Sequence, residues 1–513
     1  MKFFIVDSIN EVEGKDVIGL IADNWNDWFT FKTMYSVVYF DANGFCKNLG
    51  SVKIGEKDQE EGRPDLPSEF EQLESNFFSL GQSDSYYLEL TSLGGDVRDE
   101  ILNALNDIAY DNAIYKKFRN QKVVYDSLMR SIAQTTVLGQ FHRLAKGRVR
   151  LSKYNFNYIL ENKSTHEGTS FHFEVHPNSK PPTNVHVIIG RNGVGKTYLL
   201  TNMVRSIMNN DGLFYENEED GEIKDAAQIF AGLVFVSFSA FDYEIPLENE
   251  ETNIKYNYIG LKRREKNGNL VNKKVEDLTE EFIETLRTCF MNSKLNLWKD
   301  IIGILNSDPI FKENRISELL NEGEFQKTKH VGIGEIEDII ANAGKVFSDL
   351  SSGHKIVLLT LSSLIARVEE RTLVLMDEPE VHLHPPLLAA FTRAVSELLI
   401  NRNGVAIVAT HSPVVLQEVP SACVWKLRRY GASVSAERLQ IESFGENVGL
   451  LTSEVFRHEV TESGVYRILR ENVEEFDSFQ EIMEEFNGNL GYEAQAFLRV
   501  LLKEKKNRMN NND

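Results

Sequence analysis

The chain of 513 residues is long enough for roughly two to four domains and a large core, at about 150 residues per domain. Its 42% hydrophobic and 26% charged residues are typical of a folded protein and argue against a disordered, collagen-like or membrane-embedded chain. A formal net charge of −21 repels phosphate backbones, so any contact with nucleic acid must be local or made by a partner.

The cysteine content and the hydropathy indicate the cellular compartment of the protein. Cys46, Cys289 and Cys423 lie far apart without the spacing of a disulfide framework or a zinc module. The apolar start, Phe3 to Val6, is too short for a signal peptide, and the longest later apolar run, residues 356–366, is too short to span a bilayer. We therefore expect a cytoplasmic protein that is not exported and has no membrane partner.

The first 147 residues predict an α+β domain of unknown role. Strand-like alternation from Val17 to Gly55 predicts a small antiparallel sheet, and Asn43-Gly44 is typical of a type I′ hairpin turn. From Leu66 to about residue 146 the apolar spacing is helical, and Gly147 is a plausible end of the last helix.

Residues 148–446 predict an α/β domain, and residues 447–513 a helical C-terminal segment with a charged tail. Within the α/β domain, residues 244–346 are polar and helix-rich and predict a helical arm, which the basic, Asn-rich stretch 262–274 interrupts. The arm lacks sustained heptads and is too short for the long coiled coil of a chromosome-organising ATPase.

Residues 190–197, GRNGVGKT, match the phosphate-binding motif G-x-x-x-x-G-K-[ST] at every fixed position. A strand pattern, VHVII, leads into this P-loop and a helical pattern follows, so backbone N–H groups and the helix dipole would face the phosphates. Lys196 is predicted to neutralise the β- and γ-phosphates, and Thr197 to offer its hydroxyl to Mg²⁺. The predicted ATP-binding residues are Gly190, Asn192, Gly193, Gly195, Lys196 and Thr197.

The run RTLVLMDEPE predicts a buried parallel strand that ends in Asp377 and Glu378, at the edge where α/β sheets bind ligands. Asp377 is predicted to hold Mg²⁺ through water, and Glu378 to activate the attacking water. His411 follows the next strand pattern, GVAIVAT, and is predicted to sense the γ-phosphate. His382 and His384 are weak metal candidates, because they are alternate residues on a loop without a third ligand. We expect no cluster of carboxylates and histidines outside the ATP site that could hold a metal.

Residues 350–354, LSSGH, directly precede a helical pattern. Small hydroxyl residues and a glycine at a helix N-terminus can bind an anion, which suggests a second phosphate contact through Ser351, Ser352 and Gly353. The alternative is an ordinary serine cap. The position of Gly353, one helix and one strand before Asp377, favours the phosphate contact.

In this order and spacing, GRNGVGKT, LSSGH, DEPE and THSP resemble the motifs of the ABC ATPase superfamily over about residues 148–428. DEPEVHLHP and THSPVVL are similar to the branch that includes RecF-type repair ATPases and overcoming-lysogenisation-defect nucleases. Within that branch, residues 350–420 and FGENVGLLTSEVF most resemble the PtuA ATPase of Septu and retron-linked anti-phage defence systems.

The resemblance implies that ATP and Mg²⁺ are cofactors, that ATP is hydrolysed to ADP and phosphate, and that LSSGH completes the ATP site of a partner subunit. A chain with one copy of each motif would form a head-to-tail homodimer or a higher ring. The implied function is a switch that controls a separate HNH nuclease, with a retron reverse transcriptase and its msDNA, or DNA, as further partners. The chain itself lacks an HNH constellation and the DxD motif of a TOPRIM domain, so we expect no nuclease activity from it.

The alternative function is a RecF-like DNA-repair ATPase that clamps duplex DNA. A transporter ATPase is a more distant alternative, because nothing resembles a coupling surface. Two basic clusters are candidates for a nucleic-acid surface, with solvated protein faces as the alternative reading. They comprise Arg143, Lys146, Arg148, Arg150 and Lys153, and Lys262, Arg263, Arg264, Lys266, Lys273 and Lys274.

Two departures from the family pattern affect the expected hydrolysis rate more than ATP binding. Ser352 and His354 replace a glycine and the glutamine of the family signature LSGGQ. No glutamine occurs in LVFVSFSAFDYEIP, where the family has its Q-loop, which leaves Asp242 as a candidate for that role.

Overall fold

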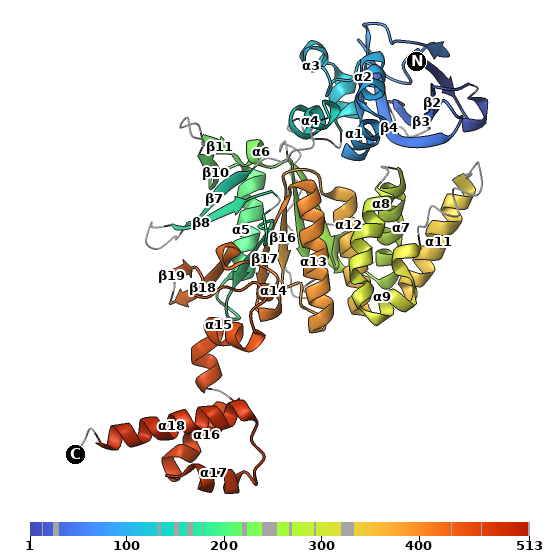
Figure 1. Cartoon of the computed structure of the whole chain (residues 1–513). Coiled ribbons are helices and arrows are strands. Elements are labelled where there is room, and N and C mark those ends of the chain that lie inside the picture. The colour runs from blue at the N-terminus through green and yellow to red at the C-terminus, as the bar shows by residue number, and fades with distance from the viewer. Residues whose placement is uncertain are drawn as a thin grey trace.

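The computed structural model describes residues 1–12, 14–23, 30–130, 132, 134, 136–147, 153–161, 168–177, 179–217, 223–238, 254–265, 269–291, 294–319, 333–431, 433–462 and 464–510. An N-terminal α+β domain, a central α/β domain with a helical arm, and a C-terminal helical segment follow one another (Figure 1). Among the described residues no helix combines the length and the apolar character needed to cross a bilayer.

The N-terminal domain contains a six-stranded sheet in the order β5-β1-β2-β3-β4-β6. Strands β2, β3 and β4, which span the range 17–55, pair antiparallel as the sequence predicts, whereas β1 pairs with β2 in parallel and makes the whole sheet mixed. The hairpin is present, but its turn is not type I′: Asp41 accepts the N–H groups of Asn43 and Phe45, and within this turn only Gly44 has a positive φ. The elements are β1 (Lys2–Val6), β2 (Val17–Ala22), β3 (Met34–Phe40), β4 (Cys46–Glu56), β5 (Glu69–Phe70), β6 (Phe77–Gly81), α1 (Asp84–Ser92), α2 (Gly95–Ala104), α3 (Asn112–Phe118) and α4 (His142–Ala145).

The central domain is built on a seven-stranded sheet in the order β13-β12-β16-β17-β9-β18-β19, parallel except for the edge strand β19. A smaller antiparallel sheet, β11-β10-β7-β8, lies beside it. The strands of the main sheet are β9 (Val185–Ile189), β12 (Gly232–Ser237), β13 (Lys255–Gly260), β16 (Thr372–Asp377), β17 (Val405–Thr410), β18 (Val424–Tyr430) and β19 (Ser433–Glu437). Those of the smaller sheet are β7 (Tyr154–Leu160), β8 (Thr169–Val175), β10 (Phe214–Asn217) and β11 (Ile223–Asp225).

Both faces of the main sheet are buried, which explains the continuous apolar runs in its strands. Val187 and Val408 face one core, with the helices of the arm and α12 and α13, whereas Ile188 and Ile407 face the other, with α5 and the smaller sheet. The helices are α5 (Lys196–Asn209), α6 (Ala226–Ile229), α12 (Ser352–Arg367), α13 (Pro385–Arg402) and α14 (Pro413–Gln417).

The arm is shorter than the sequence suggests. Part of the range 244–346 is β structure: β13 belongs to the main sheet, and the basic stretch forms a hairpin of β14 (Lys262–Arg264) and β15 (Leu270–Asn272). Strand β13 is paired along its whole length with β12, a tertiary contact that the local polar composition does not reveal. The helices of the arm are α7 (Val275–Met291), α8 (Leu295–Gly303), α9 (Pro309–Glu313) and α11 (Ile333–Asp349).

The two end regions lie on different sides of the central domain (Figure 1). The N-terminal domain contacts the side where the parallel strands begin, through ion pairs of Arg143 with Glu370 and of Arg402 with Asp84. At the other side Leu451 packs into the core, and Lys426 pairs with Glu454 at 3.0 Å. The C-terminal helices are α15 (Val448–Glu462), α16 (Gly464–Glu475), α17 (Phe479–Glu485) and α18 (Tyr492–Asn510).

Candidate functional site

Three neighbouring parallel strands deliver the predicted catalytic motifs to one edge of the main sheet. Strands β9, β17 and β16 are adjacent, and each ends at this edge. The P-loop follows β9, His411 follows β17, and Asp377 ends β16 immediately before Glu378. The sheet therefore brings together groups that lie more than 200 residues apart in the chain.

The P-loop leads directly into α5. Gly193 and Gly195 have φ values of 78° and 104°, which side chains disfavour, and this curvature turns the loop around its own centre. Lys196 is only 4% exposed, and its Nζ donates to the carbonyl oxygens of Gly190 and Arg191 at 3.1 and 3.2 Å. The lysine thus already lies inside the loop that would hold the phosphates.

Glu378 connects the three motifs. Its Oε1 lies 3.4 Å from Lys196 Nζ and 3.7 Å from His411 Nδ1. Its φ of 46° is unusual for a residue other than glycine, and such backbone strain concentrates at functional sites. The carboxylate thus lies beside the P-loop lysine and His411, in agreement with the role of base that the sequence predicts for it.

Glu380 is a site residue that the sequence analysis did not single out. Its Oε1 accepts from the Thr410 hydroxyl at 2.6 Å and from the His411 backbone N–H at 2.8 Å, and it lies 3.0 Å from His411 Nδ1. The side chain is mostly buried, whereas His411 is 44% exposed. Glu380 thus anchors the histidine and leaves its other ring nitrogen for a ligand. The available signal in the sequence was the third acidic residue of DEPE.

The metal of a nucleotide complex would be held by Asp377 and Thr197. Asp377 is 6% exposed and Thr197 is exposed at the first turn of α5. A carboxylate and a hydroxyl are hard oxygen donors, which fits Mg²⁺, an ion that completes its shell with water and phosphate oxygens. When bound, the ion would neutralise charge on the phosphates.

The LSSGH segment forms the N-terminus of α12, as its composition predicts. A Cβ atom on Gly353 would lie 2.5 Å from the His382 carbonyl oxygen, so a glycine is needed where the segment packs against the loop after DEPE. Ser351 caps no backbone group of α12 with its side chain; its Oγ lies 2.6 Å from His354 Nδ1. Ser351 and Ser352 remain exposed.

The two predicted parts of the ATP site are separate in one chain. Among the described residues, no hydrogen bond or ion pair links Ser351, Ser352 or Gly353 to Lys196 or Thr197. A γ-phosphate bound by Lys196 therefore leaves LSSGH available to another molecule.

In the described part of the chain, several residues of the two basic clusters contact acidic or aromatic side chains of the protein itself. Arg143 is paired with Glu370, Lys153 lies 3.7 Å from Glu174, and Lys146 lies over the Tyr110 ring at 3.3 Å. In the second cluster Arg263 pairs with Asp277 and Lys273 with Glu281. Arg148, Arg150, Lys266 and the Q-loop candidate Asp242 lie outside the described residues.

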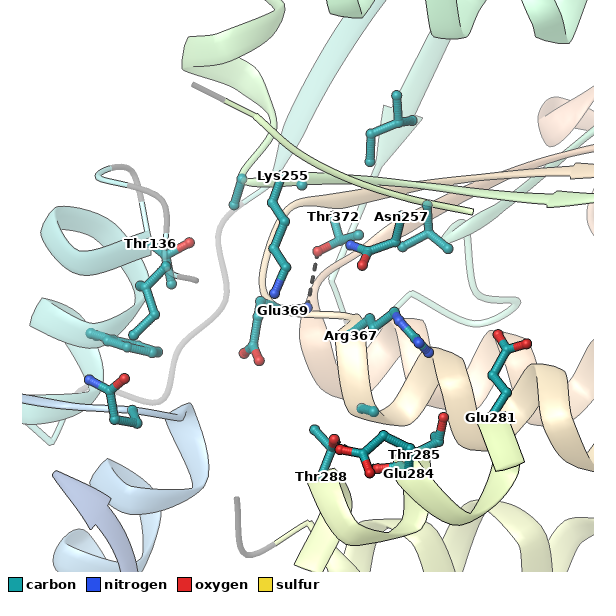
Figure 2. Close-up of a pocket in the computed structure, with 18 residues that line it drawn as sticks. Thr136, Lys255, Asn257, Glu281, Glu284, Thr285, Thr288, Arg367, Glu369 and Thr372 are labelled. Carbon is teal, nitrogen blue, oxygen red and sulfur yellow. Dashed lines mark hydrogen bonds between the residues drawn. The ribbon is translucent and has the colours of Figure 1, made fainter. Parts of the chain in front are cut away.

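A cavity of about 390 Å³ lies at the opposite edge of the main sheet, between the N-terminal domain, the strand starts and α7 (Figure 2). It is lined by Lys255, Glu281, Glu284, Arg367 and Glu369 among others, and by no P-loop residue. Burial lowers the pKa of Lys255, although Glu369 opposes this. The cavity is thus distinct from the candidate ATP site.

Comparisons with known proteins identify relatives of this chain. Residues 185–417 match the model of the family described as "AAA domain, putative AbiEii toxin, Type IV TA system". The chain is 39% identical over 498 residues to protein Ea59 of Escherichia phage lambda, and the match covers 94% of each chain.

Solved structures with similar folds include ATP-binding domains. A nucleotide-free ATP-binding cassette of an ABC transporter is 17% identical and aligns with 52% of this chain and 85% of its own, with a TM-score of 0.24. The SMC head domain of Thermotoga maritima is 14% identical and aligns with 57% of this chain and 100% of its own, with a TM-score of 0.26.

Proposed function

The chain belongs to the same family as protein Ea59 of Escherichia phage lambda, and we propose that it is an ATP-controlled switch of the ABC type. ATP bound to the P-loop of one subunit is contacted by the LSSGH segment of a second copy. Two copies arranged head to tail enclose two nucleotides, and hydrolysis separates them.

One observation carries this proposal: the P-loop, Glu378 and His411 are assembled within the chain, whereas Ser351 and Ser352 are exposed and have no contact with them. An exposed helix N-terminus with two hydroxyl groups suits a γ-phosphate that another molecule presents. The chain therefore contains two complementary half-sites, and a homodimer, or a ring of dimers, is the simplest assembly that uses both.

The finer part of the proposal is that closure of this oligomer controls a separate HNH-type nuclease in defence against phage. The resemblance to the PtuA ATPase supports it, as does the family description, which names a putative AbiEii toxin of a type IV TA system. The net charge of −21 repels DNA, which also favours a separate partner as the protein that cleaves it.

The switch is tested by mass photometry of Glu378→Gln, a variant that should retain ATP. Added MgATP should convert the subunits into a dimer or larger oligomer, and Lys196→Ala should stay unchanged as the matched control. Glu378→Gln that binds ATP but remains monomeric would contradict the head-to-tail arrangement.

The partner is tested with proteins encoded beside this chain. The chain alone, with plasmid DNA, Mg²⁺ or Mn²⁺ and ATP, should not cut, whereas the reconstituted complex should cut in a nucleotide-dependent way. Nicking by the chain alone that survives purification and is unaffected by Glu378→Gln would reveal a nuclease site within it.

A further inference from the structure

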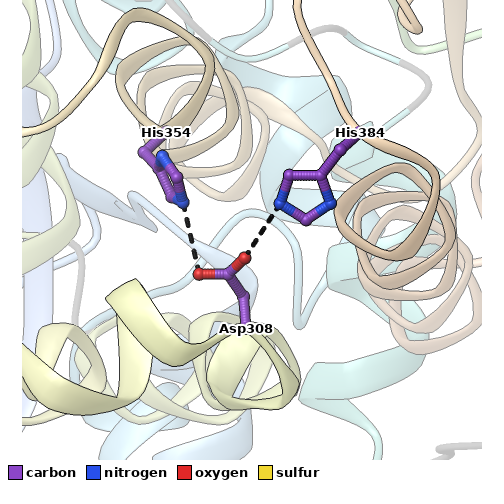
Figure 3. A group of neighbouring side chains, drawn as sticks. All are labelled: Asp308, His354 and His384. Carbon is purple, nitrogen blue, oxygen red and sulfur yellow. Dashed lines mark hydrogen bonds and ion pairs between the residues drawn. The ribbon is translucent and has the colours of Figure 1, made fainter.

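A cluster of one carboxylate and two imidazoles lies behind the LSSGH segment, contrary to the expectation that no such cluster exists outside the ATP site. Asp308 precedes α9 in the arm, His354 lies in the first turn of α12, and His384 precedes α13 (Figure 3). Asp308 Oδ1 lies 3.2 Å from His354 Nε2, and its Oδ2 lies 3.2 Å from His384 Nε2. Segments far apart in the sequence thus converge on one point.

We propose that Asp308, His354 and His384 bind a divalent transition-metal ion of the zinc class. Two imidazole nitrogens and one carboxylate oxygen form a ligand set that suits Zn²⁺, with a fourth position left for water. The site goes beyond the ATPase function and does not depend on it.

The spacing of the ligand atoms fits such an ion. All three atoms lie within 4.8 Å of one another. Tetrahedral Zn²⁺ with bonds of about 2.0–2.1 Å places its ligand atoms about 3.4 Å apart. The two imidazole nitrogens each lie 3.2 Å from a different oxygen of Asp308, so the carboxylate or one ring must turn for a single oxygen to share the ion with both rings.

Burial around the cluster is graded in the way that an open metal site requires. The Asp308 and His354 side chains are 4% and 11% exposed, whereas that of His384 is 52% exposed. Two ligands are thus fixed in the interior, and the third faces solvent, where an ion can enter and water can complete the shell.

Neighbouring groups orient the ligands. Ser351 Oγ lies 2.6 Å from His354 Nδ1, so a proton on Nδ1 would leave the Nε2 lone pair directed at the ion. Asp308 Oδ1 accepts from the backbone N–H groups of Ile310 and Phe311, which hold the carboxylate in place. Ser351 of the LSSGH segment therefore helps to orient His354 as a metal ligand.

A hydrogen-bond network without metal is the competing explanation. His384 Nδ1 accepts from the Leu387 N–H at 3.3 Å, which places the ring proton on Nε2, facing Asp308. Metal binding would move that proton to Nδ1 and give up this contact, which is longer than a usual hydrogen bond. Because the His384 ring is half-exposed, it can turn without disturbing the core.

Zinc binding to the full-length chain separates the two explanations. The protein is stripped with a chelator, dialysed against Zn²⁺ in excess Mg²⁺ without nucleotide, and its zinc content is measured by mass spectrometry. We expect about one Zn²⁺ per chain, and Co²⁺ in its place should give the visible absorption of a tetrahedral site.

Three variants assign the site: His384→Ala, Asp308→Asn, which retains a cap for α9, and His354→Gln, which restores the glutamine of the family signature. Each should weaken Zn²⁺ binding at least about tenfold. His382→Asn, which removes a neighbouring histidine at a positive φ that asparagine tolerates, should bind like the wild type. Folding of each variant is checked by circular dichroism.

The proposal is overturned if the wild type retains no Zn²⁺ or if folded His384→Ala retains as much as the wild type. Binding lost equally in His382→Asn would also overturn it, since the ion would then belong to the exposed loop. Because the His384 side chain is half-exposed, the His384→Ala variant should fold. Its zinc content therefore tests the proposal even if the variants at the two buried ligands do not fold.

Discussion

The two halves of the candidate ATP site are constructed in different ways. The P-loop half is held by adjacent strands of one sheet, and its side chains already contact one another through Glu378. The LSSGH half lies at the start of a helix and packs against the loop at His382 and the arm at Asp308. Under the proposed function the first half binds ATP within one chain, whereas the second acts on a nucleotide that another molecule presents. We therefore expect the two halves to respond differently to mutation.

Loss of the P-loop lysine should have the largest effect. Lys196→Ala removes charge-assisted contacts worth about 1.5–3 kcal/mol each, so MgATP affinity should fall about ten- to hundredfold or more. Calorimetry measures this, with Lys299→Ala on the exposed face of α8 as the control. Equal affinities would remove the basis for treating this loop as the ATP-binding half.

Glu378→Gln should separate binding from hydrolysis within the same half. ATP affinity should persist, while turnover should fall about 10²-fold or more, because the base for the attacking water is lost. A phosphate-release assay checks this. Turnover equal to that of the wild type would assign the base to another residue, with Glu380 the nearest carboxylate to His411.

Gly353→Ala should impair the other half alone. The added Cβ would press against the His382 carbonyl oxygen, and displacement of LSSGH by about 1 Å can cost up to about 10²-fold in rate. ATP binding to the single subunit should stay unchanged, while turnover and ATP-dependent assembly fall. Gly303→Ala, which meets open space, is the matched control. Weakened ATP binding in Gly353→Ala would show that the two halves are not independent.

The smallest effect that we expect is a pH dependence of stability caused by His186, on the strand that leads into the P-loop. Burial, with a contribution from the charge of Arg438, lowers the pKa of His186 on β9 from 6.5 to about 3. The unfolded chain therefore binds the proton more readily, so stability is complete above about pH 6.5 and is lost as the pH falls, by about 2 kcal/mol at pH 5. His186→Gln should flatten this slope in urea unfolding of the ATPase domain. An unchanged slope would assign the pH dependence to other groups.

Sequence alone predicted the parts of the site that depend on local geometry. A P-loop requires glycines and a lysine at fixed spacing between a strand and a helix, and Lys196 does lie within such a turn. The buried strand before Asp377 and the helix start at Ser352 follow from patterns within a few residues. The mixed α/β fold and its helical C-terminal segment were also predictable, because apolar periodicity reports which face of each element is buried.

Tertiary structure alone determined the contacts between distant segments. Strand β13 lies in a range whose overall composition is polar, and its place in the main sheet comes from its pairing with β12. Glu380 becomes an anchor only once β16 and β17 are neighbours, and Asp308 meets His354 and His384 only because the arm folds back on α12. The physical reason is that local patterns encode burial and chain direction, whereas the meeting of side chains depends on strand order and on how helices pack.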